Sequence, residues 1–149
     1  MERVKEFPRG VSLSVRPATE ADLPFVAALE AEIFSDPWSR EDIAAHLTSA
    51  HLLLLIAEAD GVGCGYLLGS LIAPEGEIYR VAVAPHARRL GAGRALCQAL
   101  LSLCDVCFLE VRRSNTAARA LYESLGFTLV GERKNYYKNP TEDACLYRR

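Results

Sequence analysis

The sequence predicts an α/β (α+β) fold in which a mixed, mostly antiparallel sheet carries helices on both faces. Strand-like stretches alternate with stretches whose apolar residues recur at helical spacing, in the predicted order β-α-α-β-β-β-α-β-α-β-β. The turn dipeptide Asp60-Gly61 joins two adjacent strand-like stretches and therefore predicts an antiparallel hairpin. At 149 residues, the chain is expected to form one domain.

The domain is predicted to span residues 11–149, after a loose polar tail at residues 1–10. Apolar and polar residues alternate from Val11 to Val15, which is typical of a half-buried strand, and Pro17 ends that strand. Thr19-Glu20-Ala21-Asp22 has the pattern of a capping box and predicts the start of a helix. The apolar stripe of this helix consists of Leu23, Val26, Leu29 and Ile33.

A second, short helix is predicted over residues 39–47, with Ser39 as its cap. The apolar run Leu52–Ala59 and the stretch Val62–Ile72 form the two strands of the predicted hairpin. Pro74-Glu75-Gly76 then makes the turn into the central strand.

The stretch from Ile78 to Leu103 predicts a strand, a glycine turn and a helix. Residues 78–83 are mainly β-branched and aromatic, as in a strand, and Pro85 ends the strand because it has no amide hydrogen. The apolar residues that follow at helical spacing are Leu96, Leu100 and Leu103.

The turn inside this stretch has the features of an anion-binding site. Gly91 and Gly93 let the backbone approach a ligand closely, and the free amides at the start of a helix favour negative charge. Three basic residues add positive charge there, namely Arg88, Arg89 and Arg94. The turn therefore predicts a pyrophosphate site, and the alternative is an ordinary strand-to-helix connection with a basic rim.

The second half of the chain predicts one more strand, one more helix and a final hairpin. Val106–Val111 is the strand, and Asn115 is placed to cap a helix that Gly126 ends. The final hairpin is predicted from Phe127–Tyr137 and Ala144–Tyr147.

Glu110 and Tyr122 are the candidate catalytic residues. Glu110 is a carboxylate on an otherwise apolar strand, so it can act as a general base or simply face solvent. Tyr122, inside a predicted helix, can supply a proton or be a core aromatic with its hydroxyl at the surface. Asn115 can contact a ligand or only cap its helix.

Composition excludes several classes of protein. The formal net charge of −2 argues against general binding of nucleic acid. No apolar run approaches the roughly 20 residues of a membrane span, and the N-terminal residues lack the apolar core of a signal peptide, so the cytoplasm is the expected compartment. The five cysteines are expected to be reduced, and Cys104-x-x-Cys107 lacks the second pair of a structural zinc site.

The glycine turn resembles the Arg/Gln-x-x-Gly-x-Gly/Ala signature of the GCN5-related N-acetyltransferases, the GNAT superfamily, and the predicted topology resembles that fold from about Val11 onward. The resemblance implies an acyl-CoA N-acyltransferase fold, acetyl-CoA as co-substrate and no metal. It also implies the residues that bind acetyl-CoA, which are Val81, Ala82, Val83, Arg88, Arg89, Leu90, Gly91, Ala92, Gly93, Arg94 and Asn115.

Two further motifs resemble the ribosomal-protein-alanine N-acetyltransferase branch of that superfamily. They are Leu-Glu-Val-Arg, which contains Glu110, and Leu-Tyr-Glu-Ser-Leu-Gly-Phe, which contains Tyr122. The resemblance implies that Glu110 is the general base and Tyr122 the general acid. It further implies a peptide slot bordered by residues of Phe-x-x-Pro-Trp-Ser and Asn-Tyr-Tyr segments, here Phe34, Trp38, Tyr136 and Tyr137.

The expected reaction is transfer of the acetyl group to the free N-terminal amine of a cytoplasmic protein, in the first place an N-terminal alanine of a small-subunit ribosomal protein. The alternatives are an acetyltransferase for lysine side chains or a small amine, and a coenzyme-A-binding regulatory module without catalysis. The chain is expected to act as a monomer and to bind neither nucleic acid nor membrane.

Overall fold

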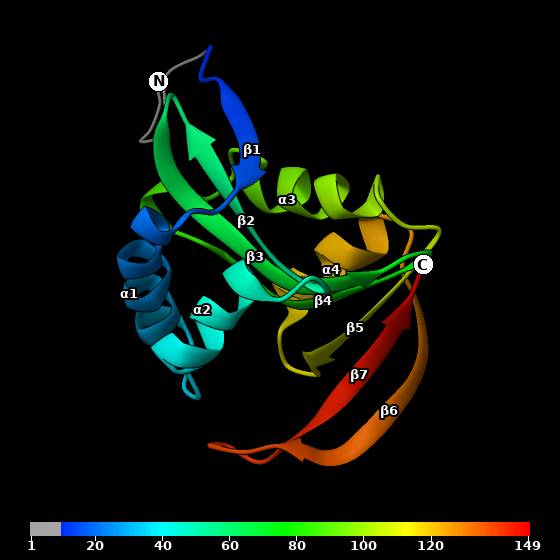
Figure 1. Cartoon of the computed structure of the whole chain (residues 1–149). Helices are drawn as coiled ribbons and strands as arrows, with labels where there is room; N and C mark the ends of the chain where they lie inside the picture. Colours follow the sequence, from blue (N-terminus) through cyan, green and yellow to red (C-terminus); the bar gives the residue numbers. More distant parts are fainter. Residues whose placement is uncertain (1–9) are drawn as a thin grey trace.

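The structure is a computed structural model that describes residues 10–149, so that the expected tail at residues 1–10 lies, apart from Gly10, outside the described residues. The described part forms one sheet of seven strands with four α-helices (Figure 1). The strands are β1 (Leu13–Pro17), β2 (Leu52–Ala59), β3 (Val62–Ile72), β4 (Glu75–Val83), β5 (Val106–Arg112), β6 (Thr128–Tyr137) and β7 (Glu142–Arg148). The helices are α1 (Leu23–Ile33), α2 (Arg40–Thr48), α3 (Ala92–Leu101) and α4 (Thr116–Ser124), with short 3₁₀ helices at Glu20–Asp22 and Pro85–Ala87.

The predicted fold class and order of elements are confirmed, with small errors at element ends. The central strand begins at Glu75 rather than after the predicted Pro74-Glu75-Gly76 turn. Helix α3 ends at Leu101, so Leu103 lies outside it and is 54% exposed. Strand β7 begins at Glu142, two residues before the predicted start at Ala144, because Glu142 pairs with Tyr137 of β6.

Local sequence signals explain several of these elements. Asp60 and Gly61 both have positive φ, as the tight turn of a β2–β3 hairpin requires. The backbone amide of Thr19 donates to the Asp22 carboxylate at 2.8 Å, which is one half of the predicted capping box. Ser39 Oγ accepts from the Asp42 amide at 3.1 Å and caps α2. The predicted caps are therefore confirmed.

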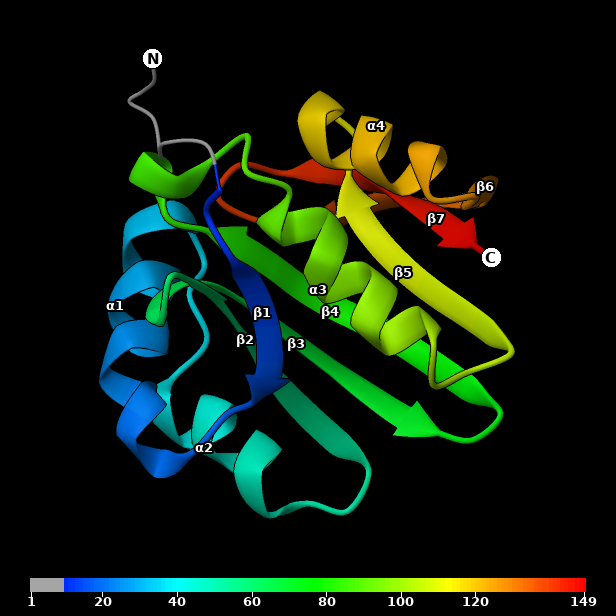
Figure 2. The same ribbon diagram turned by 90° about the horizontal axis from the view of Figure 1, so that it is seen from above.

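The helices cover the two faces of the sheet in pairs, α1 with α2 and α3 with α4 (Figures 1 and 2). Each pair encloses its own apolar core. The core under α3 and α4 includes Leu96, Leu100 and Leu125, and the core under α1 and α2 includes Val26 and Ile43. All five cysteines are free, as expected. No helix within residues 10–149 is long and apolar enough to cross a membrane.

The sheet order is β1-β2-β3-β4-β5-β7-β6, and every neighbouring pair is antiparallel except β4 and β5. These two strands pair in parallel only from Glu75 opposite Val106 to Ile78 opposite Leu109. Beyond that point they separate. Because peptide groups along a strand point alternately to its two sides, part of the backbone from Tyr79 to Val83 has no partner strand on the β5 side.

Candidate active site

A cavity of about 390 Å³ lies where β4 and β5 separate. Its lining includes Val81 of β4, Glu110 of β5, Asn115 at the N-cap of α4, Tyr122 of α4, and Tyr137 of β6. These are five of the residues that the sequence predicted for catalysis, cofactor binding or substrate binding. The fold thus brings residues from four elements to one cavity.

A second cavity, of about 590 Å³, adjoins the first and shares Glu110 and Tyr137 with it. Its lining adds Trp38 and Tyr136, while Phe34 borders the first cavity. All four residues that were expected to border a peptide slot therefore border one of the two cavities. We call the two cavities together the slot.

Glu110 lies where the two cavities meet. Its carboxylate is 2.6 Å from Arg133 Nε and its side chain is 23% exposed. The negative charge of Glu110 is the main cause of a raised pKa of Tyr136. Burial, followed by the same charge, raises the pKa of Tyr137 to about 12. The carboxylate thus lies within electrostatic reach of Tyr136 and Tyr137, two of the residues that border the slot.

Tyr122 is almost fully buried and packs against Phe127, with the two ring centroids 5.8 Å apart. Its hydroxyl makes no hydrogen bond to any residue in the described part of the chain, although Tyr122 lines the first cavity. Burial raises the pKa of Tyr122, so the hydroxyl keeps its proton at neutral pH. Such a group can donate a proton to a leaving group in the cavity.

The glycine turn lies outside the lining of both cavities and is separated from the end of β4 by the 3₁₀ helix Pro85–Ala87. Gly91 has φ of 89° and precedes α3, and no side chain among residues 10–149 caps the first amides of the helix. A Cβ on Gly93 would lie 3.4 Å from Leu121 and 3.7 Å from Val83, so this glycine brings α3 close to both α4 and β4. Free helix amides next to the open edge of β4 are suited to an anionic ligand that extends toward the slot.

The side chains of Arg88 and Arg94 in this turn point in different directions. Arg88 Nε donates to the carbonyl oxygen of Val83 at 3.3 Å, which places its side chain beside the end of β4. Arg94 donates to Ser124 Oγ at 2.6 Å and therefore points to the end of α4. Asn115 Oδ1 accepts from the Ala118 amide at 3.1 Å, so it caps α4 and also lines the first cavity.

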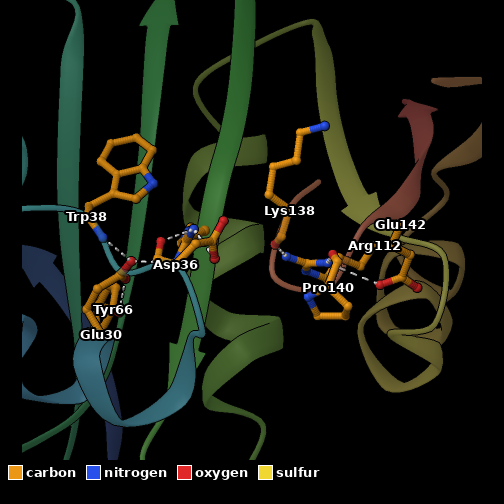
Figure 3. A network of polar contacts seen from close by, with 9 residues as sticks. Glu30, Asp36, Trp38, Tyr66, Arg112, Lys138, Pro140 and Glu142 are labelled. Carbon is orange, nitrogen blue, oxygen red and sulfur yellow. Dashed lines mark hydrogen bonds and ion pairs between the residues drawn. The ribbon is translucent and has the colours of Figure 1, made fainter. Parts of the chain in front are cut away.

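Sequence reasoning missed a buried carboxylate beside the slot. Glu30 of α1 is fully buried and forms an ion pair with Arg80 of β4, which lines both cavities. Tyr66 Oη donates to the other oxygen of Glu30 at 2.6 Å (Figure 3). The signal in the sequence was a charged residue beside the apolar stripe of α1 and an arginine within the apolar strand β4. Glu77 was missed as well, and burial, followed by the charge of Glu110, raises its pKa.

Residues 23–127 match the acetyltransferase (GNAT) family. The chain belongs to this family. It is therefore an acetyltransferase, as the sequence motifs predicted, and the predicted acyltransferase fold is confirmed.

Relatives of known name in this family are similar over most of their length. N-alpha-acetyltransferase RimI of Mycobacterium tuberculosis is 38% identical over 139 residues, which is 88% of each chain. The ribosomal protein bS18-alanine N-acetyltransferase of Escherichia coli K12 is 35% identical over 82% of this chain and 84% of its own. The crystal structure of the Escherichia coli ribosomal-protein-S18-alanine N-acetyltransferase matches with a TM-score of 0.83 and 30% identity over 92% of each chain. This GNAT chain is thus similar to N-acetyltransferases of the RimI type.

Proposed function

We propose that this acetyltransferase transfers the acetyl group of acetyl-CoA to the free N-terminal amine of a protein, in the first place an N-terminal alanine of a small-subunit ribosomal protein. The observation that carries the proposal is that Glu110 and Tyr122 line one cavity at the separation of β4 and β5. The names of the relatives that act on bS18-alanine support this choice of substrate. Such a substrate places the reaction in the cytoplasm, and we expect the chain to act as a monomer.

The residues around the glycine turn fit acetyl-CoA. The uncapped start of α3 and Arg88 beside it would hold the pyrophosphate, and the open edge of β4 from Val81 to Val83 would bind the arm that leads to the slot. The remaining turn residues and Asn115 complete the proposed binding surface. Acetyl-CoA supplies an activated acetyl group as a thioester, so the protein has only to position the amine and move two protons.

Glu110 would accept the proton that the amine loses as it attacks the thioester carbonyl. An α-amine titrates near pH 8, whereas a lysine side chain titrates near 10.4 and costs roughly 3 kcal/mol more to deprotonate at neutral pH. A single carboxylate is therefore adequate for an N-terminal amine. This difference favours the N-terminus over the lysine alternative.

Two donors would complete the reaction. A free backbone amide of Val83 or its neighbour on β4 would stabilise the charge that develops on the carbonyl oxygen. Tyr122 would give its proton to the thiolate of coenzyme A as the carbon–sulfur bond breaks. A module that only binds coenzyme A would need neither Glu110 nor Tyr122 at the cavity.

The test is an assay of short peptides with acetyl-CoA, followed by mass spectrometry. Three peptides begin with Ala, Ser or Met. A fourth begins with a blocked Ala and carries an internal Lys. Acetylation confined to free N-termini with small first residues is the expected result. Transfer only to the internal Lys, or equal rates on simple amines, would contradict the proposal. Purified ribosomal proteins assayed in the same way would then identify the protein substrate.

A further inference from the structure

Two segments that are far apart in the sequence form the walls of the slot. One is the α1–α2 loop, residues 34–39, and the other is the β6–β7 turn, residues 138–141. Residues of the α1–α2 loop line both cavities, and so do residues from the end of β6 and the β6–β7 turn. The distance between these two segments therefore sets the width of the slot.

Arg80 fastens the α1–α2 loop to the sheet. Its Nη2 donates to the carbonyl oxygen of Asp36 at 3.0 Å and to the Asp36 carboxylate at 3.1 Å. Its Nη1 binds Glu30, whose same oxygen accepts the backbone amide of Trp38 at 3.0 Å (Figure 3). The guanidinium also lies over the Phe34 ring, 4.1 Å from its centroid. Because Glu30 is fully buried, removing Arg80 would leave its charge uncompensated.

Arg112 fastens the β6–β7 turn in the same manner. Its Nη2 donates to the carbonyl oxygen of Lys138 at 2.6 Å, and its Nη1 donates to that of Pro140 at 2.9 Å. Nη1 also contacts Glu142 at 3.3 Å, and the guanidinium lies 4.6 Å from the centroid of the Tyr137 ring. As in the first network, bonds to main-chain carbonyls fix the path of the backbone, and Figure 3 shows the two networks as separate groups.

The two arginines come from neighbouring strands, β4 and β5, and lie beyond the point at which these two strands stop pairing with each other. Each guanidinium is a rigid planar fork, so each can hold several acceptors of a loop in one fixed arrangement. The side chains are 12% exposed for Arg80 and 20% for Arg112, which limits screening by water. One residue beside the opening thus fixes each wall.

We propose that Arg80 and Arg112 are positioning residues that set the width of the slot and thereby exclude large N-terminal residues. The proposal rests on the proposed N-terminal acetyltransferase function. It assigns selectivity to two residues that touch the walls of the slot rather than the reacting atoms. Losing either arginine should release one wall and admit larger first residues.

The first test needs no substrate. Trp38 is the only tryptophan in the sequence and lies in the α1–α2 loop, so its fluorescence reports on that loop. Arg80→Met should make Trp38 more accessible to quenching by acrylamide, and Arg112→Met should not. Arg16→Met is the matched control, because Arg16 also binds two carboxylates, those of Asp22 and Glu58, but does not line the slot. If Arg80→Met fails to fold, Arg80→Lys is tested in its place. The lysine keeps a positive charge beside Glu30 but lacks the Nη2 group that donates to Asp36.

The second test compares kcat/KM for peptides that begin with Ala and with Leu. In a slot of fixed width, a few added methylene groups change specificity by about tenfold or more, so each variant should lower the Ala-to-Leu ratio by about tenfold. The KM for the Ala peptide should rise in Arg80→Met and Arg112→Met, while affinity for acetyl-CoA stays near that of the wild type. Arg16→Met should keep the wild-type ratio even where it lowers the melting temperature.

Three results would overturn the inference: unchanged quenching in the Arg80 variants, an unchanged Ala-to-Leu ratio in both arginine variants, or the same ratio change in Arg16→Met. A wild-type enzyme that acetylates no N-terminal peptide would refute the proposed function instead. The quenching experiment would still decide whether Arg80 fastens the loop.

Discussion

Replacing Glu110 by Gln tests the proposed base without disturbing the fold. The ion pair that the substitution removes joins Glu110 to Arg133, whose side chain is 58% exposed. An ion pair this exposed contributes less than about 1 kcal/mol to stability, so the variant should fold and bind peptide. Because the amide of Gln cannot accept a proton at neutral pH, the variant can use only amine that is already neutral.

The expected size of the effect follows from the amine. With a pKa near 8, about 10% of an N-terminal amine is neutral at pH 7 and about 90% at pH 9. The Glu110→Gln rate should therefore be far below that of the wild type at pH 7 and should rise about tenfold by pH 9. The wild-type rate should rise less over this range, because the carboxylate removes the proton at either pH.

The assay measures kcat from pH 6.5 to pH 9.5 with a saturating concentration of a peptide that begins with Ala. The measurements are spaced by about one pH unit or less. Arg133→Gln is the matched control, because it breaks the same ion pair and keeps the carboxylate. This control should retain the pH profile of the wild type. A Glu110→Gln enzyme with wild-type rate and profile would refute the assignment of Glu110 as the base.

Three other substitutions test separate parts of the structure. Tyr122→Phe should leave the melting temperature almost unchanged, because the hydroxyl makes no hydrogen bond to any residue in the described part of the chain. It should lower turnover by about 100-fold. Near wild-type turnover would mean that Tyr122 only packs in the core. Gly93→Glu should raise the calorimetric dissociation constant for acetyl-CoA about tenfold or more. Gly93→Ala is the control, because its Cβ would come no closer than 3.4 Å to a neighbouring atom, in Leu121. Equal affinity in the Glu variant would count against the turn. Arg16 lowers the pKa of Asp22 to about 2, so Asp22→Asn should cost about 1 kcal/mol in urea unfolding at pH 7, allowing for the partly exposed arginine. Because this folded pKa lies below that of the unfolded chain, the difference should shrink as pH falls from about 4 toward 2, and a constant difference would exclude the ion pair as its source.

The sequence predicted those parts of the fold whose signals are local. A few neighbouring residues are enough to predict a helix cap such as Ser39, a turn residue such as Gly61 or the start of a helix after Gly91. Each of these features depends on contacts with residues close by in the sequence. Glu110 and Tyr122 could be named as candidates because each stands in a short motif. That both residues line one cavity depends on the separation of β4 from β5, and no local sequence pattern predicts this separation.

What the sequence did not predict depends on contacts between distant residues. Glu30 and Arg80 are 50 positions apart in the sequence, and no local pattern around either residue predicts that the two form an ion pair. Helix and strand ends were displaced for a similar reason. Leu103 has the spacing to continue α3, but the chain turns toward β5 after Leu101, and no buried position remains for it.

The separation of β4 from β5, on which the whole site depends, has its physical origin in the neighbouring strand pair. In the β3–β4 ladder Leu68 pairs with Arg80 and Gly69 pairs with Ile78, so Tyr79 is an extra residue and β4 bulges there. A bulge bends its strand and increases the local twist. The pairing of β4 with β5 ends at Ile78, immediately before this bulge, while β5 remains paired with β7 as far as Arg112.

Glycine at position 69 makes this arrangement possible, because a Cβ there would collide with the carbonyl oxygen of Glu77. At the level of Arg80, β4 no longer pairs with β5, whereas β7 remains paired with β5 on the other side. The part of β4 that no longer pairs with β5, Glu110 and Tyr122 then border the same cavity. One extra residue opposite a glycine thus converts a continuous sheet into one with an opening between two strands, and the candidate site follows from that opening.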